Sequence, residues 1–126
     1  MKILVAEDDE IFRALSTEIL TDAGYEVTAK ENGLLAWEYL QAGNHADMCV
    51  LDVNMPEMDG FELARRIRES ENLKHLPILM LTVKAFAEDQ LEGYESGVDD
   101  YLTKPFDRDV FLARLKVLER RILNKG

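Results

Sequence analysis

The sequence is poor in cysteine and in long apolar runs. Its single cysteine, Cys49, has no partner for an intramolecular disulfide and lies in an apolar run, so we expect a small buried hydrophobe and no oxidising compartment. The longest uncharged apolar stretch, Leu76 to Val83, is far shorter than the ~20 residues of a membrane helix. No export signal follows Lys2, so the sequence predicts a cytoplasmic protein.

Basic residues are scarce relative to acidic ones. The 126 residues include 15 Lys and Arg against 25 Asp and Glu, a net charge of −10. This excess disfavours direct contacts with nucleic acid phosphates and with anionic membrane surfaces. Residues 108–126 are the exception, with six basic and two acidic side chains. That local excess either suits the C-terminal dipole of a last helix or forms an interface.

Repeats, low-complexity segments and Pro/Gly/Ser linkers are absent. With 47% hydrophobic residues, the chain has the composition of one domain with its own core. We expect that domain to cover residues 1–121 and residues 122–126 to form a helix end or a tail.

Short apolar runs alternate with stretches of helical spacing. The runs cover residues 3–6, 25–29, 48–51, 78–81 and 101–102. The clearest helical stripe comprises Phe111, Leu115, Leu118 and Ile122, and a second comprises Ile11, Leu15 and Ile19. Strands that alternate with helices indicate a parallel sheet covered on both faces, so the sequence predicts a (βα)5 fold of the α/β class.

Stop and start signals agree with these boundaries. Gly24 and Gly97 each follow a helical stretch, at the position of a left-handed cap. Asp59 and Glu62 have capping-box spacing at the start of the third helix.

Charged and hydroxyl side chains follow the predicted strands. They are Glu7, Asp8, Asp9 and Glu10 after the first run, Asp52 after the third, Thr82 after the fourth and Lys104 after the fifth. Ligand sites of open α/β sheets form outside the carboxyl ends of the strands. These side chains are therefore the candidate site residues.

Their chemistry points to phosphoryl transfer onto an aspartate. If the first and third strands are neighbours, the carboxylates of Glu7, Asp8 and Asp52 converge and need a divalent cation to neutralise them. Oxygen ligands suit Mg²⁺, and the lack of a Cys or His cluster argues against zinc. Lys104 adds a charge for an anion and Thr82 a hydroxyl donor. Taken singly, Asp8, Asp9 or Asp52 also fits a helix N-cap, Lys104 a surface residue and Thr82 a strand residue.

Four motifs resemble the receiver domain of two-component response regulators, from Lys2 to about Arg121. They are Ile3-Leu4-Val5-Ala6-Glu7-Asp8-Asp9, then Leu51-Asp52-Val53-Asn54-Met55-Pro56 with Met58-Asp59-Gly60, then Leu81-Thr82, and Gly97-Val98-Asp99-Asp100-Tyr101-Leu102-Thr103-Lys104-Pro105-Phe106. Each motif alone is weak, but all four occur in order and at family spacing. The resemblance implies the doubly wound, flavodoxin-like receiver fold with strand order 2-1-3-4-5.

The resemblance also implies a role for each site residue. Asp52 is the expected phosphoacceptor, supplied by a phosphohistidine of a sensor histidine kinase or phosphotransfer protein. Mg²⁺ is expected on Asp8, Asp52 and the Asn54 carbonyl, with Glu7 reaching it through water. Asp9 lies outside this set and is expected to cap the first helix.

The same resemblance implies a switch. Lys104 is expected to pair with the phosphoryl oxygens, Thr82 to hydrogen-bond them, and Tyr101 to swing into the space that Thr82 vacates. The change reaches the surface built from the fourth helix, fifth strand and fifth helix. The resemblance also implies a cis peptide between Lys104 and Pro105.

Two residues depart from the commonest receiver pattern. Val83 stands where Ala or another small residue is usual, so its methyl groups are expected to crowd the phosphoryl group and slow its turnover. Lys84 stands where fast members often carry an acid, and its effect on the rate stays open.

Partners follow from the resemblance as well. Asp99 and Asp100, with Arg114 and Arg121, resemble charges that pair between subunits of transcriptional members, which predicts a phosphorylation-favoured homodimer. The same surface suits a target protein. A stand-alone receiver and a module excised from a longer regulator both remain open.

Three rival classes fit less well. A magnesium-dependent phosphatase that forms an aspartyl-phosphate shares Asp52-Val53-Asn54 but needs a second acid two residues on. A calcium loop that starts at Asp52 fails at Glu57, where glycine is required, and at Leu63, where a bidentate acid is required. A flavin protein needs a phosphate loop after the first strand, where four acids stand instead.

Overall fold

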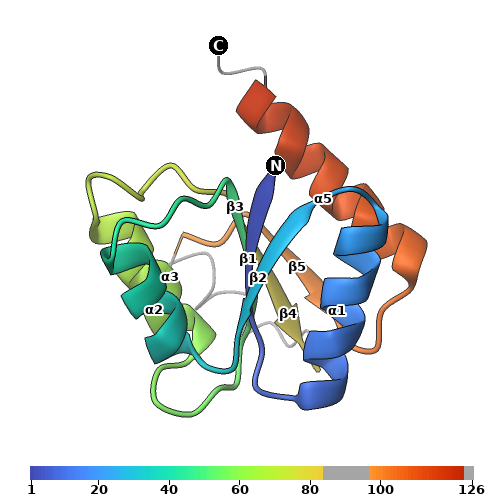
Figure 1. The fold of residues 1–126 in the computed structure, drawn as a ribbon, viewed down its shortest axis with the longest axis horizontal. Helices are drawn as coiled ribbons and strands as arrows, with labels where there is room; N and C mark the ends of the chain where they lie inside the picture. Colours follow the sequence, from blue (N-terminus) through green and yellow to red (C-terminus); the bar gives the residue numbers. More distant parts are fainter. Residues whose placement is uncertain (84–96, 124–126) are drawn as a thin grey trace.

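Five parallel strands form one sheet at the centre of the molecule (Figure 1). The computed structural model describes residues 1–83 and 97–123. The strands are β1 (Lys2–Ala6), β2 (Glu26–Lys30), β3 (Met48–Asp52), β4 (Ile78–Thr82) and β5 (Asp100–Thr103). Their order is β2-β1-β3-β4-β5, which confirms the predicted order 2-1-3-4-5. Each predicted strand is found, with its ends displaced by at most one residue.

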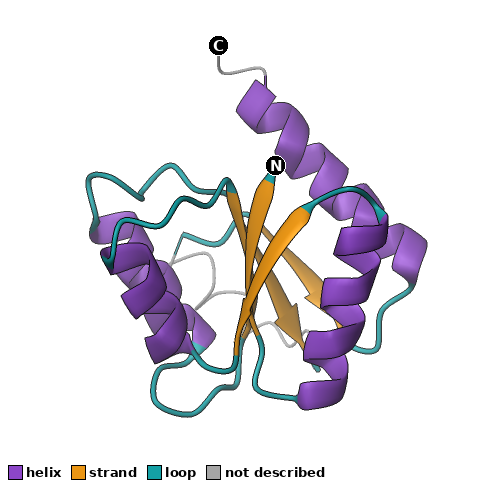
Figure 2. Cartoon of the chain, in the orientation of Figure 1, coloured by secondary structure: helices purple, strands orange, loops and turns teal. Residues whose placement is uncertain are grey.

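Helices cover both faces of this sheet (Figure 2). They are α1 (Glu10–Asp22), α2 (Gly33–Gln41), α3 (Gly60–Glu69) and α5 (Arg108–Leu123). Helices α2 and α3 pack on one face, and α1 and α5 pack on the other (Figure 1). The helix predicted between the fourth and fifth strands falls on residues 84–96, which lie outside the described residues.

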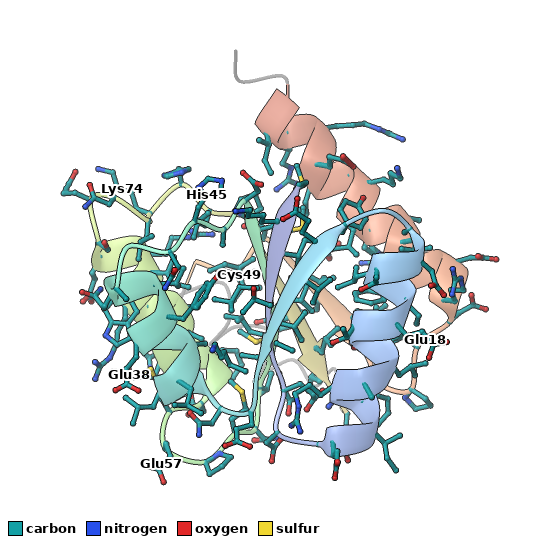
Figure 3. The ribbon with its side chains drawn as sticks, in the orientation of Figure 1. Glu18, Glu38, His45, Cys49, Glu57 and Lys74 are labelled. Atoms are coloured by element: carbon teal, nitrogen blue, oxygen red, sulfur yellow. The ribbon has the colours of Figure 1, made fainter. Side chains whose placement is uncertain are left out.

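The strands divide their apolar side chains between two cores because successive side chains point to opposite faces. Leu4 and Cys49 belong to the core under α2 and α3, whereas Ile3 and Val50 belong to the core under α1 and α5. Cys49 is fully buried, as predicted, and burial raises the pKa of its thiol to about 12. Figure 3 shows it among the strands.

Helix caps follow the sequence signals. Asp9 caps α1 by accepting hydrogen bonds from the Ile11 and Phe12 amides at 2.9 and 3.0 Å. Asp59 caps α3 by accepting from the Glu62 amide at 2.8 Å. The Glu62 carboxylate pairs with Arg65 and Arg66 along the helix. Gly24, after α1, and Gly97 have φ of 95° and 86°, the left-handed conformation that was predicted. The helix that Gly97 was predicted to follow lies outside the described residues.

One predicted stripe is wrong and another is right. Ile11 and Leu15 of α1 are 78% and 40% exposed, so only Ile19 of the predicted stripe faces the core. Residues four apart on a helix are rotated by ~40°, so the two steps from Ile19 back to Ile11 turn the side chain by ~80°, away from the buried face. The α5 stripe is buried at Phe111, Leu115 and Leu118 and half-buried at Ile122.

In the part of the chain that the structure describes, no helix combines the length and the apolar character needed to cross a bilayer. Helix α5 continues to Leu123, so residues 122 and 123, expected to form a helix end or a tail, are helical.

Gly60, at the start of α3, allows a close approach between this helix and the end of β3. An added Cβ would lie 2.3 Å from the Asp52 carbonyl oxygen and 2.8 Å from the Met80 sulfur. We expect Gly60→Ala to lower the free energy of unfolding by about 1–3 kcal/mol, because the backbone carbonyl must move. Urea denaturation measures this loss. Arg65→Ala, an exposed change on the same helix, is the control, with an expected change within about 0.5 kcal/mol. Equal stabilities of Gly60→Ala and the native protein would contradict the steric argument.

Candidate functional site

The carboxyl ends of β1, β3, β4 and β5 meet at one edge of the sheet, the lower edge in Figure 1. Ala6 is aligned with Leu51, and Asp52 is aligned with Leu81. Glu7 and Asp8 therefore follow β1 where Asp52 ends β3. The register brings together side chains that are 45 positions apart in the sequence.

Three carboxylates cluster at this edge, as the sequence predicted. Oxygen atoms of Glu7, Asp8 and Asp52 all lie within 4.8 Å of one another. Glu7 is fully buried, Asp52 is 5% exposed and Asp8 is exposed. Asp9 does not join them because its carboxylate caps α1.

Lys104 enters the same cluster from the end of β5. Its Nζ lies 2.7 Å from Glu7 Oε1 and 3.2 Å from Asp52 Oδ1, and the side chain is almost completely buried. The Lys104 amide donates to the Thr82 carbonyl at 2.6 Å, which ties β5 to β4. The Lys104–Pro105 peptide bond is cis, the isomer that the resemblance implies.

The pocket has more negative than positive groups. Burial raises the pKa of the Asp52 carboxyl to about 8; Glu7 and Asp8 add to this rise, and Lys104 opposes it. Burial also works against the charge of Lys104, but its carboxylate partners Glu7 and Asp52 hold its pKa above the ordinary value. Three carboxylates and one ammonium carry a formal charge of −2. A divalent cation would balance that charge.

The support of the acidic loop was not predicted from the sequence. Arg13 donates from Nη1 to the backbone carbonyl of Glu7 at 2.9 Å and to that of Asp8 at 3.4 Å. The direct ion pair between Glu7 and Lys104 was not predicted either; it joins residues 97 positions apart. The contact of Arg13 could have been predicted from the helix cap. Because Asp9 caps α1, residue 13 lies one turn into the helix, and its side chain can reach back to the loop before the helix.

The remaining predicted residues lie around this pocket. Thr82 ends β4 and is 2% exposed, and Tyr101 of β5 is buried. Asn54 is exposed in the loop after β3, so its part in metal binding stays a prediction. Val83 is 57% exposed next to Thr82, and Lys84 lies outside the described residues.

The charges predicted to pair between subunits are paired within this chain. Asp99 accepts from Arg68 at 2.9 Å and lies 3.4 Å from Arg121. Asp100 lies 2.9 Å from Arg114. A homodimer through these residues stays a prediction. To form it, the ion pairs within each chain would have to break and re-form between the two chains.

The calcium-loop alternative has no ligand at its last place. Glu57, labelled at the bottom of Figure 3, adopts φ of 71°, the conformation that a calcium loop gives to its glycine. Leu63, at the place of the bidentate acid, is fully buried in the core. The chain therefore makes the turn of a calcium loop but lacks the carboxylate that would complete the calcium ligands.

Comparison with known proteins agrees with this geometry. Residues 3–116 match the response regulator receiver domain. The transcriptional regulator RpaA of Synechocystis is 38% identical over 120 residues, which cover 95% of this chain and 49% of that protein. The chemotaxis protein CheY of Pseudomonas aeruginosa is 39% identical over 122 residues, which cover 95% of this chain and 98% of that protein.

One of the similar solved structures contains a metal ion. The receiver domain of the Pseudomonas aeruginosa sensor histidine kinase PA1611 has a TM-score of 0.84 and 31% identity, with 96% of each chain covered. In that protein a magnesium ion is coordinated in the active-site cleft. The present chain spans about half the length of most of the curated transcriptional relatives that it matches.

Crowding of the carboxylates leads to a stability prediction. We expect Asp52→Asn to raise the free energy of unfolding by about 1–2 kcal/mol in magnesium-free buffer at neutral pH, because it removes a carboxyl whose ionisation is disfavoured in the folded pocket, while Glu7 keeps its pair with Lys104. Mg²⁺ is expected to stabilise the native protein and to have a smaller effect on the variant. Urea denaturation with and without Mg²⁺ measures both effects.

Asp47→Asn, at the opposite end of the sheet, is the matched control. Burial pushes the pKa of Asp47 up, but the Lys2 amide and His45 outweigh it and lower the pKa, so its charge is stabilising. We expect this variant to be less stable than the native protein, by the same amount with and without Mg²⁺. A loss of stability in magnesium-free Asp52→Asn would contradict the crowding argument.

Proposed function

Because the chain belongs to the response regulator receiver domain family, we propose that it is a phosphorylation-dependent switch of a two-component system, with Asp52 as its phosphoacceptor. The observation that carries the proposal is the carboxylate of Asp52, which ends β3 against the buried ammonium of Lys104. The donor is a phosphohistidine of a sensor histidine kinase or of a phosphotransfer protein. The domain is a signalling phosphoacceptor that assists its own phosphorylation and dephosphorylation, not a conventional enzyme.

The chemistry needs one bond formed and one bond broken. An oxygen of Asp52 forms the bond to phosphorus, and the phosphorus–nitrogen bond of the donor breaks, so that the histidine ring departs. Lys104 and the Thr82 hydroxyl are the donors that receive the phosphoryl oxygens. Lys104 already stands 3.2 Å from the accepting carboxylate, so it needs little movement to do so.

The donor set fits Mg²⁺. The carboxylates of Asp8 and Asp52 and the backbone carbonyl of Asn54 would hold the ion, with Glu7 acting through water, and all of these are oxygen ligands. The pocket charge of −2 and the magnesium ion in the PA1611 receiver domain support this assignment. When bound, the ion supplies positive charge that offsets the charge of the incoming phosphoryl group.

Output follows from the same pocket. Thr82 and Tyr101 belong to adjacent strands, and we infer that phosphorylation alters the surface of β5 and α5. The fourth helix that the resemblance adds to this surface falls outside the described residues. The partner is a target protein or an attached output domain. Asp99, Asp100, Arg114 and Arg121 are the residues for a phosphorylation-favoured homodimer. The acidic domain itself is not expected to bind nucleic acid or membrane, and we place it in the cytoplasm.

Chemical phosphorylation tests the proposal. Incubation with acetyl phosphate and Mg²⁺ is expected to add one phosphoryl group per chain, which mass spectrometry detects and hydroxylamine removes. Asp52→Asn is expected to lose this label, because an amide cannot form the acyl phosphate. Removal of Mg²⁺ with a chelator is expected to abolish labelling of the native protein.

Asp47→Asn is the control and is expected to label like the native protein, since Asp47 lies at the other end of the sheet. Equal labelling of Asp52→Asn and the native protein would show that Asp52 is not the acceptor. Steady turnover of a small phosphomonoester would favour the phosphatase alternative.

Val83 gives a prediction on the lifetime of the phosphorylated state. Its exposed, branched side chain stands directly after Thr82, where it crowds the approach of water to the phosphoryl group. We expect Val83→Ala to shorten the acyl-phosphate lifetime by roughly two- to tenfold, as followed by loss of the label. Val117→Ala, an exposed change on α5, is expected to leave the lifetime unchanged. Equal lifetimes in Val83→Ala and the native protein would end this idea.

A further inference from the structure

Lys104 has an aromatic neighbour besides its two carboxylate partners. Its Nζ lies over the ring of Phe12, 4.6 Å from the centroid. The face of an aromatic ring attracts an ammonium, more strongly when water is excluded, and this ammonium is buried. The three contacts come from three elements: the loop after β1, the end of β3 and the first turn of α1.

Contacts of both the backbone and the ring hold Phe12 in place. Its backbone amide is fixed by the Asp9 cap at 3.0 Å. The centroid of its ring lies 6.1 Å from the centroid of the Phe106 ring. The Phe106 centroid lies 4.7 Å from that of the Phe111 ring. Phe111 is fully buried under α5. This row of rings connects the site to the core and leaves Phe12 a defined place beside the ammonium.

We propose that Phe12 is a positioning residue for phosphoryl transfer, one that holds the Lys104 ammonium at Asp52 without occupying an N–H donor. The proposal rests on the function proposed above. An ammonium has three N–H donors, and within the described residues Glu7 and Asp52 take two of them. A ring attracts the charge as a whole and offers no lone pair. A carboxylate in its place would compete with the phosphoryl oxygens for the third donor.

Position 12 permits a graded test. We expect Phe12→Leu, which keeps apolar bulk and loses the ring, to slow labelling of Asp52 by acetyl phosphate roughly five- to thirtyfold. Phe12→Tyr keeps the ring and is expected to label within about twofold of the native rate. Ile11→Leu, an exposed change on the same turn of α1 that leaves the Phe12 ring in place, is the matched control, with a change of less than about threefold. Urea denaturation of each variant verifies that it is folded under the assay conditions.

Fluorinated phenylalanines at position 12 test the same idea with almost no change of shape. Each added fluorine withdraws electrons from the ring face, so the logarithm of the labelling rate is expected to fall in step with fluorine number. A flat series would overturn the proposal, because it would show that only the shape of Phe12 matters. Loss of rate in Phe12→Tyr equal to that in Phe12→Leu would overturn it as well.

A second readout does not depend on phosphorylation. The ε-methylene protons of Lys104 beside the Phe12 ring are expected to show an upfield ring-current shift by NMR, retained in Phe12→Tyr and lost in Phe12→Leu. If this shift behaves as expected while Phe12→Leu labels at the native rate, the role of Phe12 is wrong and the proposed function stands. If the native protein takes no label at Asp52, the proposed function fails, and the role of Phe12 fails with it.

Discussion

The balance of charge around one buried ammonium organises the functional end of this molecule. Lys104 is almost completely buried, and its Nζ contacts carboxylates from the loop after β1 and from β3. Burying a lone cation costs several kcal/mol, so the lysine is stable there only because Glu7 and Asp52 neutralise it. The same carboxylates, with Asp8, outnumber it and leave the pocket net negative. The ion pairs stabilise the buried lysine, but the pocket keeps an excess of negative charge. That excess suits a cation, and a bound cation would in turn allow an anion to approach.

The parallel sheet makes this pocket possible. Carboxyl ends of parallel strands meet at one edge, and the register of β1 with β3 and of β4 with β5 determines which residues meet. Gly60 lets α3 approach the Asp52 carbonyl, and Arg13 holds the carbonyls of the acidic loop from behind. Backbone contacts thus position both the end of β3, which carries Asp52, and the acidic loop that lies beside it.

A second charged network lies away from this pocket. Arg68 donates to the carbonyls of Gly97, Lys74 and Leu76 as well as to the Asp99 carboxylate. Asp99 also accepts from the Ile78 amide at 2.7 Å. Asp99 is therefore part of the internal structure that joins α3, β4 and β5. Any role of this aspartate between subunits would have to be compatible with that structural one.

Much of this was readable in the sequence because it depends on local pattern. Alternating apolar runs predicted the strands, Asp9 and Asp59 predicted the caps, and residues after the strands predicted the acidic pocket. Packing decided the rest. Only the tertiary structure turned Ile11 and Leu15 to solvent, because the sheet selects which face of α1 is buried. Only long-range register paired Glu7 with Lys104 and placed the Phe12 ring beside it, since no local pattern encodes contacts between residues more than 90 positions apart.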